Sequence, residues 1–328
     1  MNREGHPFVL RSLVASALLA CAAPAPRVEP APRFVFQSRA WVNLHHFLRA
    51  EARRQARGAA LVQPLAELDP GEREAWTAAL AAYCDLAQRN LLFDPELVRI
   101  HVALSTADEG RALDAGTVGE ELTVALNGAL PVFRAHLWPE RSRANEEWIA
   151  RTRPEVERLA AGVTSALAAA YRLDWPTRPI LMDVTSDTGP NLAYTTNDAP
   201  PGFAGLATLN PSVEGGSPAA IECVFHEASH VVDAQLVRWI EEESARQGTL
   251  PPADLWHALL FYTSGELTRR ALGTAGTFRA DLEQGFPAYL PALDAHWLPY
   301  LDGEEALDDA LRGLVREAAA ARGAGTSG

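Results

Sequence analysis

The chain has 328 residues and a formal net charge of −13. All 29 of its basic residues are arginines, and they form no basic stretch, which argues against a protein that binds the phosphates of nucleic acids. A hydrophobic fraction of 48% and a charged fraction of 22% are typical of a globular protein, with length for one large domain or two modest ones.

The N-terminus has the pattern of an export signal. Arg3 and Arg11 precede an apolar run that is too short to span a bilayer, and the run ends in the letters LLAC. This ending resembles the bacterial lipobox, which implies a lipoprotein signal peptide at 1–20 and a lipidated Cys21 as the chain's sole contact with a membrane. A tether rich in Pro and Ala follows at 21–33. An ordinary signal peptide, which would leave the protein secreted or periplasmic, is the alternative.

Residues 34–176 are predicted to form a helical region. Apolar residues recur at three- and four-residue spacing in 37–55 and again in 73–92, as on one face of a helix. A third long helix is predicted in 150–173, with Pro154 in its first turn, where a proline is tolerated.

We interpret the cysteines after residue 21 and the paired histidines His45 and His46 as structural residues. Beyond Cys21 only Cys84 and Cys223 remain, and two buried thiols are a better interpretation than one disulfide bridge. His45 and His46 lie among aromatic and aliphatic residues of a predicted helix. We interpret them as core histidines and not as metal ligands.

The remaining part, 177–325, has an α+β order, in which strands are followed by a pair of helices. The predicted strands, separated by Gly and Pro, are 178–186, 191–196 and 203–212. A helix with Ser217 as its N-cap is predicted to run without interruption to Ser244. A second helix is predicted at 253–272, ending at Gly273.

The first helix of this pair carries the letters HEASH at 226–230. His226 and His230 are four residues apart, so on a helix they project side by side and can bind one Zn²⁺. Glu227 flanks them, where it can take a proton from a water molecule held by the metal. A catalytic zinc site needs a third protein ligand and keeps one position open for that water.

This segment resembles the zincin superfamily of metallopeptidases, in which a small sheet precedes the helix that carries the motif. The metzincin branch continues with a glycine and a histidine where this chain has Asp233 and Leu236, and the sequence context of the aspzincin branch is absent as well. The gluzincin branch, to which thermolysin belongs, takes a glutamate from a later helix. The resemblance therefore implies Glu266 as the third ligand. A salt bridge with Arg269 or Arg270 is the alternative role of Glu266.

What the resemblance implies is a zinc-dependent metallohydrolase, most simply a peptidase that acts on peptide or protein substrates with Glu227 as the base. Asp233 is a candidate to accept a hydrogen bond from the imidazole of His230. The segment 203–212 is predicted to be an edge strand that pairs with an extended substrate. The donor to the oxyanion is left open between four residues, which are Tyr262, Tyr194, His257 and Tyr289.

Two other functions are compatible with the same residues. In the first, the protein is a catalytically inactive zinc-binding or structural lipoprotein of the cell envelope. In the second, no zinc is bound, and the histidines are hydrogen-bonded packing residues. Metal analysis of the purified protein separates the second from the rest.

Overall fold

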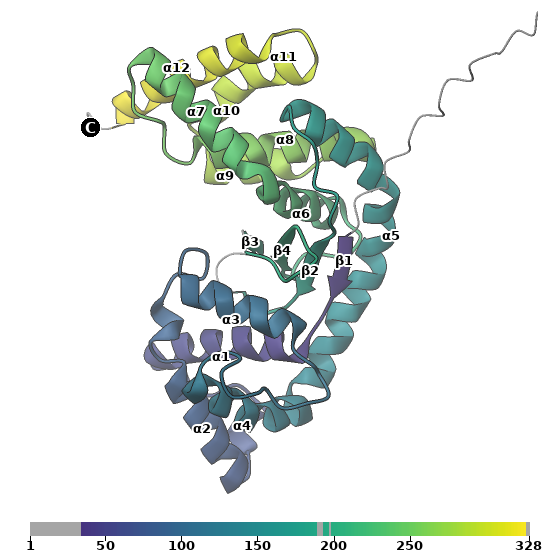
Figure 1. The fold of residues 1–328 in the computed structure, drawn as a ribbon, viewed down its shortest axis with the longest axis vertical. Helices are drawn as coiled ribbons and strands as arrows, with labels where there is room; N and C mark the ends of the chain where they lie inside the picture. Colours follow the sequence, from purple (N-terminus) through teal and green to yellow (C-terminus); the bar gives the residue numbers. More distant parts are fainter. Residues whose placement is uncertain (1–33, 189–192, 197, 326–328) are drawn as a thin grey trace, which may run out of the picture. The chain divides into compact units, whose positions relative to one another are not determined.

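The computed structural model describes residues 34–188, 193–196 and 198–325, which belong to one compact unit (Figure 1). The predicted signal peptide and the whole predicted tether, Cys21 included, precede these residues and lie outside the described part of the chain. The fold is α+β as predicted, mainly helical with one small mixed sheet. The strands are β1 (Phe34–Gln37), β2 (Ile180–Val184), β3 (Ala193–Thr196) and β4 (Gly205–Leu209).

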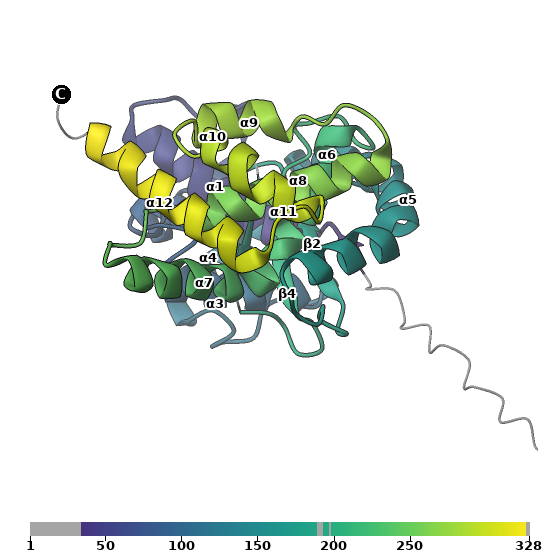
Figure 2. The same ribbon diagram turned by 90° about the horizontal axis from the view of Figure 1, so that it is seen from above.

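The helices fall into two groups along the chain. Before the central strands lie α1 (Ala40–Ala56), α2 (Pro70–Ala82), α3 (Pro95–Thr106), α4 (Glu120–His136) and α5 (Trp138–Ala170), with short turns η1 (Leu65–Glu67) and η2 (Leu86–Gln88). After them lie α6 (Pro218–Ser229), η3 (His230–Val232), α7 (Asp233–Gln247), α8 (Leu255–Leu272), α9 (Phe278–Gly285), α10 (Leu290–Ala292), η4 (Leu293–Trp297), α11 (Leu298–Leu301) and α12 (Leu307–Gly325). Figure 2 shows α12 running beside α7, with which it is in contact.

The sheet has the strand order β1-β2-β4-β3. β2 is parallel to both β1 and β4, whereas β3 is antiparallel to β4. The prediction that 203–212 forms an edge strand was therefore wrong. Both sides of β4 are used, because β2 takes one side and β3 takes the other, and β3 is the strand that lies at this edge of the described sheet.

The two faces of the sheet belong to different cores. Along β2, Ile180, Met182 and Val184 join a core made with α5, α6 and α8, while Asp183 between them points the other way, as alternation in a strand requires. Tyr194 of β3 belongs to the second core, which is built mainly from α1 to α4. Figure 1 shows the sheet between these two sets of helices, with α5 running alongside both.

The long helix α5 differs from its prediction. It begins at Trp138 with Pro139 in its first turn, and Pro154 lies inside it. A proline within a helix removes one backbone hydrogen bond. Burial of Trp148 and Val156 on either side of Pro154 holds the helix together across that point. Because this part of α5 packs on the sheet, the predicted boundary at residue 176 does not separate the two cores.

The helix predicted between Ser217 and Ser244 is interrupted. Ser217 caps α6 as predicted, since its side chain accepts a hydrogen bond from the amide of Ala220 at 3.3 Å. The helix then tightens into η3, and Val232 leaves helical geometry at φ −127° before α7 begins. α8 ends at Gly273 in the left-handed conformation (φ +69°), as predicted.

Neither a membrane-spanning helix nor a disulfide bridge occurs in the part of the chain that the structure describes. No helix there combines the length and the apolar character that crossing a bilayer demands. Cys84 and Cys223 are free thiols, but Cys84 is exposed and Cys223 is only partly buried, so the prediction of two buried thiols was wrong.

Candidate metal centre

Three histidines from two helices meet beside the edge of the sheet. His226 lies in the last turn of α6 and His230 directly after it, one helical turn along, so their rings lie 5.0 Å apart between centroids. α8 packs against α6 and supplies His257 from its first turn. One ring nitrogen of each residue belongs to a group of ligand atoms that all lie within 4.8 Å of one another.

The spacing of these nitrogens fits a single zinc ion. His226 Nε2 lies 3.3 Å from His230 Nε2 and 3.4 Å from His257 Nε2. Two nitrogens bound tetrahedrally to one zinc ion at about 2.0–2.1 Å would lie about 3.3–3.4 Å apart. Imidazole nitrogen is also a preferred ligand of this metal. The residues therefore suit zinc in chemistry, and two of the three distances between the nitrogens match one ion, while the third pair lies within 4.8 Å.

The outer nitrogens of His226 and His230 have different surroundings. His230 Nδ1 lies 3.5 Å from Asp233 Oδ2, the contact expected of a ligand imidazole whose second nitrogen donates to a carboxylate. His226 Nδ1 is buried without a hydrogen-bond partner among the described residues. A proton on Nδ1 of each ring would leave a lone pair at each Nε2, and these two atoms lie 3.3 Å apart. Converging lone pairs repel each other, and a cation between them removes that repulsion.

Burial keeps the histidines in the form that binds metal. Desolvation, followed by the charges of His230 and His257, holds the pKa of His226 well below its usual range. Burial likewise lowers the pKa of His257 to about 4. Both rings are therefore neutral at pH 7, and only a neutral imidazole has a nitrogen lone pair to give to a metal.

The Glu227 carboxylate lies next to His226. This carboxylate is buried, with Oε1 3.9 Å from His226 Nε2 and Oε2 2.7 Å from Thr195 Oγ1. Desolvation raises the pKa of the Glu227 carboxyl, and the charge of His230 and the hydrogen bond from Thr195 lower it in part. A raised pKa makes this carboxylate a better proton acceptor than an exposed glutamate.

Aromatic rings enclose the histidines. Trp256 stacks on His257 with an angle of 22° between the ring planes and meets the edge of His230. Phe261, one turn after His257, packs on His226 at 4.5 Å between centroids. An apolar wall of this kind limits the access of water and fixes the orientation of the rings.

Glu266 lies outside this group. It is nine residues after His257 (266 − 257 = 9), which is two and a half turns of helix and puts it on the opposite side of α8. Its carboxylate is bound by Arg269 at 2.7 and 2.8 Å and by Arg270 at 2.8 Å, which is the alternative role named above. In the ligand set that the geometry supports, His257 replaces Glu266.

Each of the four residues considered as the oxyanion donor has a contact or a place in the structure of its own. Tyr262 donates to Asp294 at 2.7 Å, and Tyr289 donates to the carbonyl of Ala253 at 2.5 Å. Tyr194 lies on the opposite face of β3 from Thr195, where its hydroxyl bonds to two other histidines. His257, the fourth candidate, is in the metal group itself.

The histidines of the helical half are buried in the second core, as predicted. His46 Nε2 lies 3.0 Å from the hydroxyl of Tyr194, and His45 Nδ1 lies 2.8 Å from that of Tyr83. His101, which the sequence analysis passed over, completes this group by bonding to Tyr194 at 3.1 Å. These histidines are packing residues joined by hydrogen bonds.

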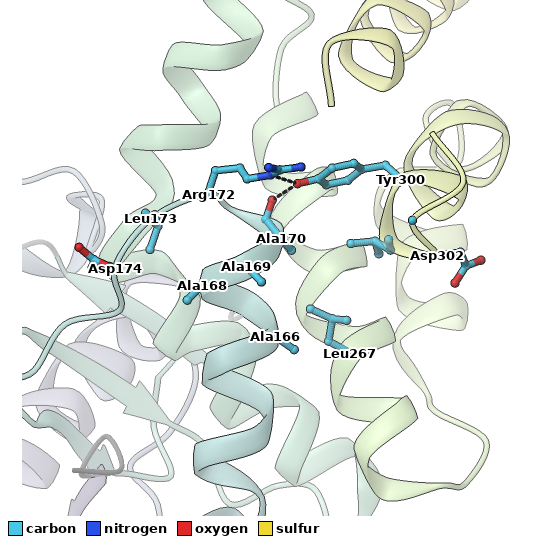
Figure 3. Close-up of a pocket in the computed structure, with 12 residues that line it drawn as sticks. Ala166, Ala168, Ala169, Ala170, Arg172, Leu173, Asp174, Leu267, Tyr300 and Asp302 are labelled. Atoms are coloured by element: carbon cyan, nitrogen blue, oxygen red, sulfur yellow. Dashed lines mark hydrogen bonds between the residues drawn. The ribbon is translucent and has the colours of Figure 1, made fainter. Parts of the chain in front are cut away.

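A cavity of about 970 Å³ lies elsewhere, between the C-terminal end of α5, α8 and α11 (Figure 3). Arg172 donates to the hydroxyl of Tyr300 at 3.1 Å, and that hydroxyl donates to the carbonyl of Ala170 at 2.7 Å. None of the residues that line the cavity is a histidine of the metal group or Glu227. This cavity is therefore separate from the metal group.

Comparisons with known protein families, with curated proteins and with solved structures found no match for this chain.

Proposed function

We propose that this protein is a zinc-dependent metallohydrolase, most simply a peptidase, in which His226, His230 and His257 bind zinc and Glu227 is the general base. The observation that carries the proposal is the convergence of three imidazole nitrogens at 3.3 and 3.4 Å with a buried carboxylate beside them. Three protein ligands leave one coordination position open, as catalytic zinc sites require.

The chain's own residues have defined roles in this reaction. When bound, zinc polarises the peptide carbonyl and makes water a stronger acid. Glu227 accepts the proton that the attacking water loses and returns it to the nitrogen of the departing amine. Trp256 and Phe261 hold the imidazoles in place and keep bulk water away from them.

We also propose that the sheet, α6 and α8 form a zincin-like unit. A sheet precedes the helix that carries HEASH, and the edge strand β3 contacts that helix. The proposed third ligand departs from the gluzincin pattern, because a histidine from the first turn of α8 takes the place of a glutamate. β3, and not β4, is then the strand open to an extended substrate.

A matched pair of variants tests the ligand set. Purified wild-type protein is expected to contain close to one zinc per chain, and His257→Ala to lose most of it. Glu266→Ala changes the same helix on its opposite side and is expected to keep its zinc. Retention of zinc by His257→Ala together with its loss from Glu266→Ala would restore the glutamate as the ligand.

The role of the base has its own test. Glu227→Gln keeps the size of the side chain and removes its ability to accept a proton, so zinc content is expected to stay the same while peptide hydrolysis disappears. Hydrolysis of a peptide library by Glu227→Gln at the wild-type rate would contradict the assignment of Glu227 as the base.

A zinc protein without turnover is the second candidate. The side chains of His226 and His230 are only 11% and 13% exposed, which also suits a closed, structural metal site. This candidate predicts wild-type protein that holds zinc and hydrolyses no peptide in the same library.

Export and lipidation at Cys21 form a separate proposal, which rests on the pattern of the first 21 residues. Labelling of the expressed protein with a fatty acid is expected in the wild type and not in Cys21→Ala. Equal labelling of both proteins would exclude Cys21 as the anchor.

A further inference from the structure

The two oxygens of the Glu227 carboxylate have different surroundings. Oε2 lies 2.7 Å from the hydroxyl oxygen of Thr195, a distance typical of a strong hydrogen bond to a carboxylate. Oε1 is the oxygen nearer to the metal group, 3.9 Å from His226 Nε2. One oxygen is therefore held by the sheet and the other faces the metal position.

The position of Thr195 is set by the sheet. β3 pairs with β4 in an antiparallel register that places Thr195 opposite Ala207. Its neighbours Tyr194 and Thr196 are buried and point to the opposite face, so Thr195 is directed to the face that contacts α6. Thr195 Oγ1 also lies 2.9 Å from the backbone carbonyl of Glu227, so its one proton has two acceptors within reach, of which the carboxylate Oε2 is the nearer.

We propose that Thr195 is a positioning residue for the base: its hydroxyl occupies Oε2 and thereby makes Oε1 the oxygen that takes and returns the proton. The inference rests on the proposed hydrolase function. A carboxyl group that is protonated on Oε1 still accepts a hydrogen bond at Oε2. Thr195 can therefore keep its contact with Glu227 before and after the proton is transferred.

Each bond that forms in this proton transfer is matched by a bond that breaks. An O–H bond of water breaks as a bond between hydrogen and Oε1 forms, and the oxygen of that water supplies the electron pair that attacks the peptide carbonyl carbon. When the C–N bond breaks, the bond between Oε1 and hydrogen breaks too, and the proton joins the departing nitrogen. Without Thr195, the plane of the carboxylate can rotate away from the angle at which one oxygen faces the metal position, so fewer encounters have the productive geometry.

Three variants test this role in the zinc-loaded full chain. Thr195→Val keeps the branched shape and removes the hydroxyl; kcat is expected to fall about ten- to a hundredfold with KM and zinc content unchanged. Thr195→Ser restores the hydroxyl and is expected to recover most of the lost kcat. Thr196→Val makes the same change on the other face of the strand, where the hydroxyl donates to the carbonyl of Asp198, and is expected to leave kcat unchanged. A wild-type kcat for Thr195→Val, or a Thr195→Ser variant as slow as Thr195→Val, would overturn the proposal.

A readout that needs no turnover separates this inference from the proposed function. The ¹³C resonance of the Glu227 carboxyl group, assigned by its absence in Glu227→Gln, is expected to shift in Thr195→Val and to stay in place in Thr196→Val. An unchanged resonance in Thr195→Val refutes the positioning role even if the protein is an active hydrolase. Wild-type protein that hydrolyses nothing while the resonance shifts refutes the hydrolase and leaves the Thr195 contact established.

Discussion

Acidification is expected to destabilise the second core through His46. This imidazole is fully buried, and burial, followed by the charges of His45, His101 and Arg49, holds its pKa well below the ordinary value of 6.5. The unfolded chain takes up a proton at His46 as the pH falls through about 6.5, whereas the folded chain does not. Unfolding therefore gains protons, and stability is lost as the pH drops below 6.5.

The size of this loss of stability follows from the protonation of His46 in the folded and in the unfolded chain. If His46 stays neutral in the folded chain at pH 5, protonation of the unfolded chain costs about 2 kcal/mol of stability relative to pH 7.5. His46→Gln removes this titration and can still accept a hydrogen bond from the hydroxyl of Tyr194. The variant should lose about 2 kcal/mol less than the wild type between the two pH values.

Urea unfolding at pH 7.5 and pH 5.0, carried out on both proteins without added metal, measures this difference. Comparing the two pH values within each protein cancels any destabilisation that the substitution causes equally at both. The other histidines are the same in both proteins, so titration that does not depend on His46 cancels as well. Equal losses of unfolding free energy in the wild type and in His46→Gln would refute the reasoning.

Three further predictions concern α8 and the metal group. Glu266→Ala is expected to lower the free energy of unfolding by only about 1 kcal/mol, because both of the arginines that bind Glu266 are about one-third exposed. A loss above about 3 kcal/mol in urea titrations would contradict this. Gly265→Ala is expected to cost about 1–3 kcal/mol, since an added methyl group would overlap the side chain of Phe278, and an unchanged melting temperature would disprove it. Treatment with a chelator is expected to lower the melting temperature of the wild type and not that of His257→Ala, and equal shifts in calorimetry would count against the three-histidine site.

Local chemistry made much of the fold predictable. Spacing of apolar residues identified α1, and the caps Ser217 and Gly273 marked the beginning of α6 and the end of α8. The break after Ser229 had no such signal, because no Gly or Pro interrupts the pattern there. Val231 packs directly over Gly205 of β4, so the turn at η3 depends on a contact between distant parts of the chain.

The candidate site also combines features set by local sequence with one that depends on the packing of distant segments. His226, Glu227 and His230 follow from five consecutive letters, since their relation is fixed by one helical turn. The third ligand depends on which side of α8 faces α6. Leu259, Leu260 and other buried residues cover α8 on several sides, so its sequence pattern does not reveal that side. His257 was named as a candidate for the site in another role, and only the packing of the helices shows its position beside His226.

The first and last histidines of the metal group, His226 and His257, are 31 positions apart in the chain (257 − 226 = 31). Cys84 and Cys223 are free, so a metal ion here would be the one strong cross-link among the residues that the structure describes. Unlike a disulfide, such a cross-link does not depend on the redox state of its compartment; it opens when acid protonates the imidazoles or when a competing chelator removes the ion. Metal supply and acidity, and not oxidation, would then determine how firmly α6 and α8 are joined.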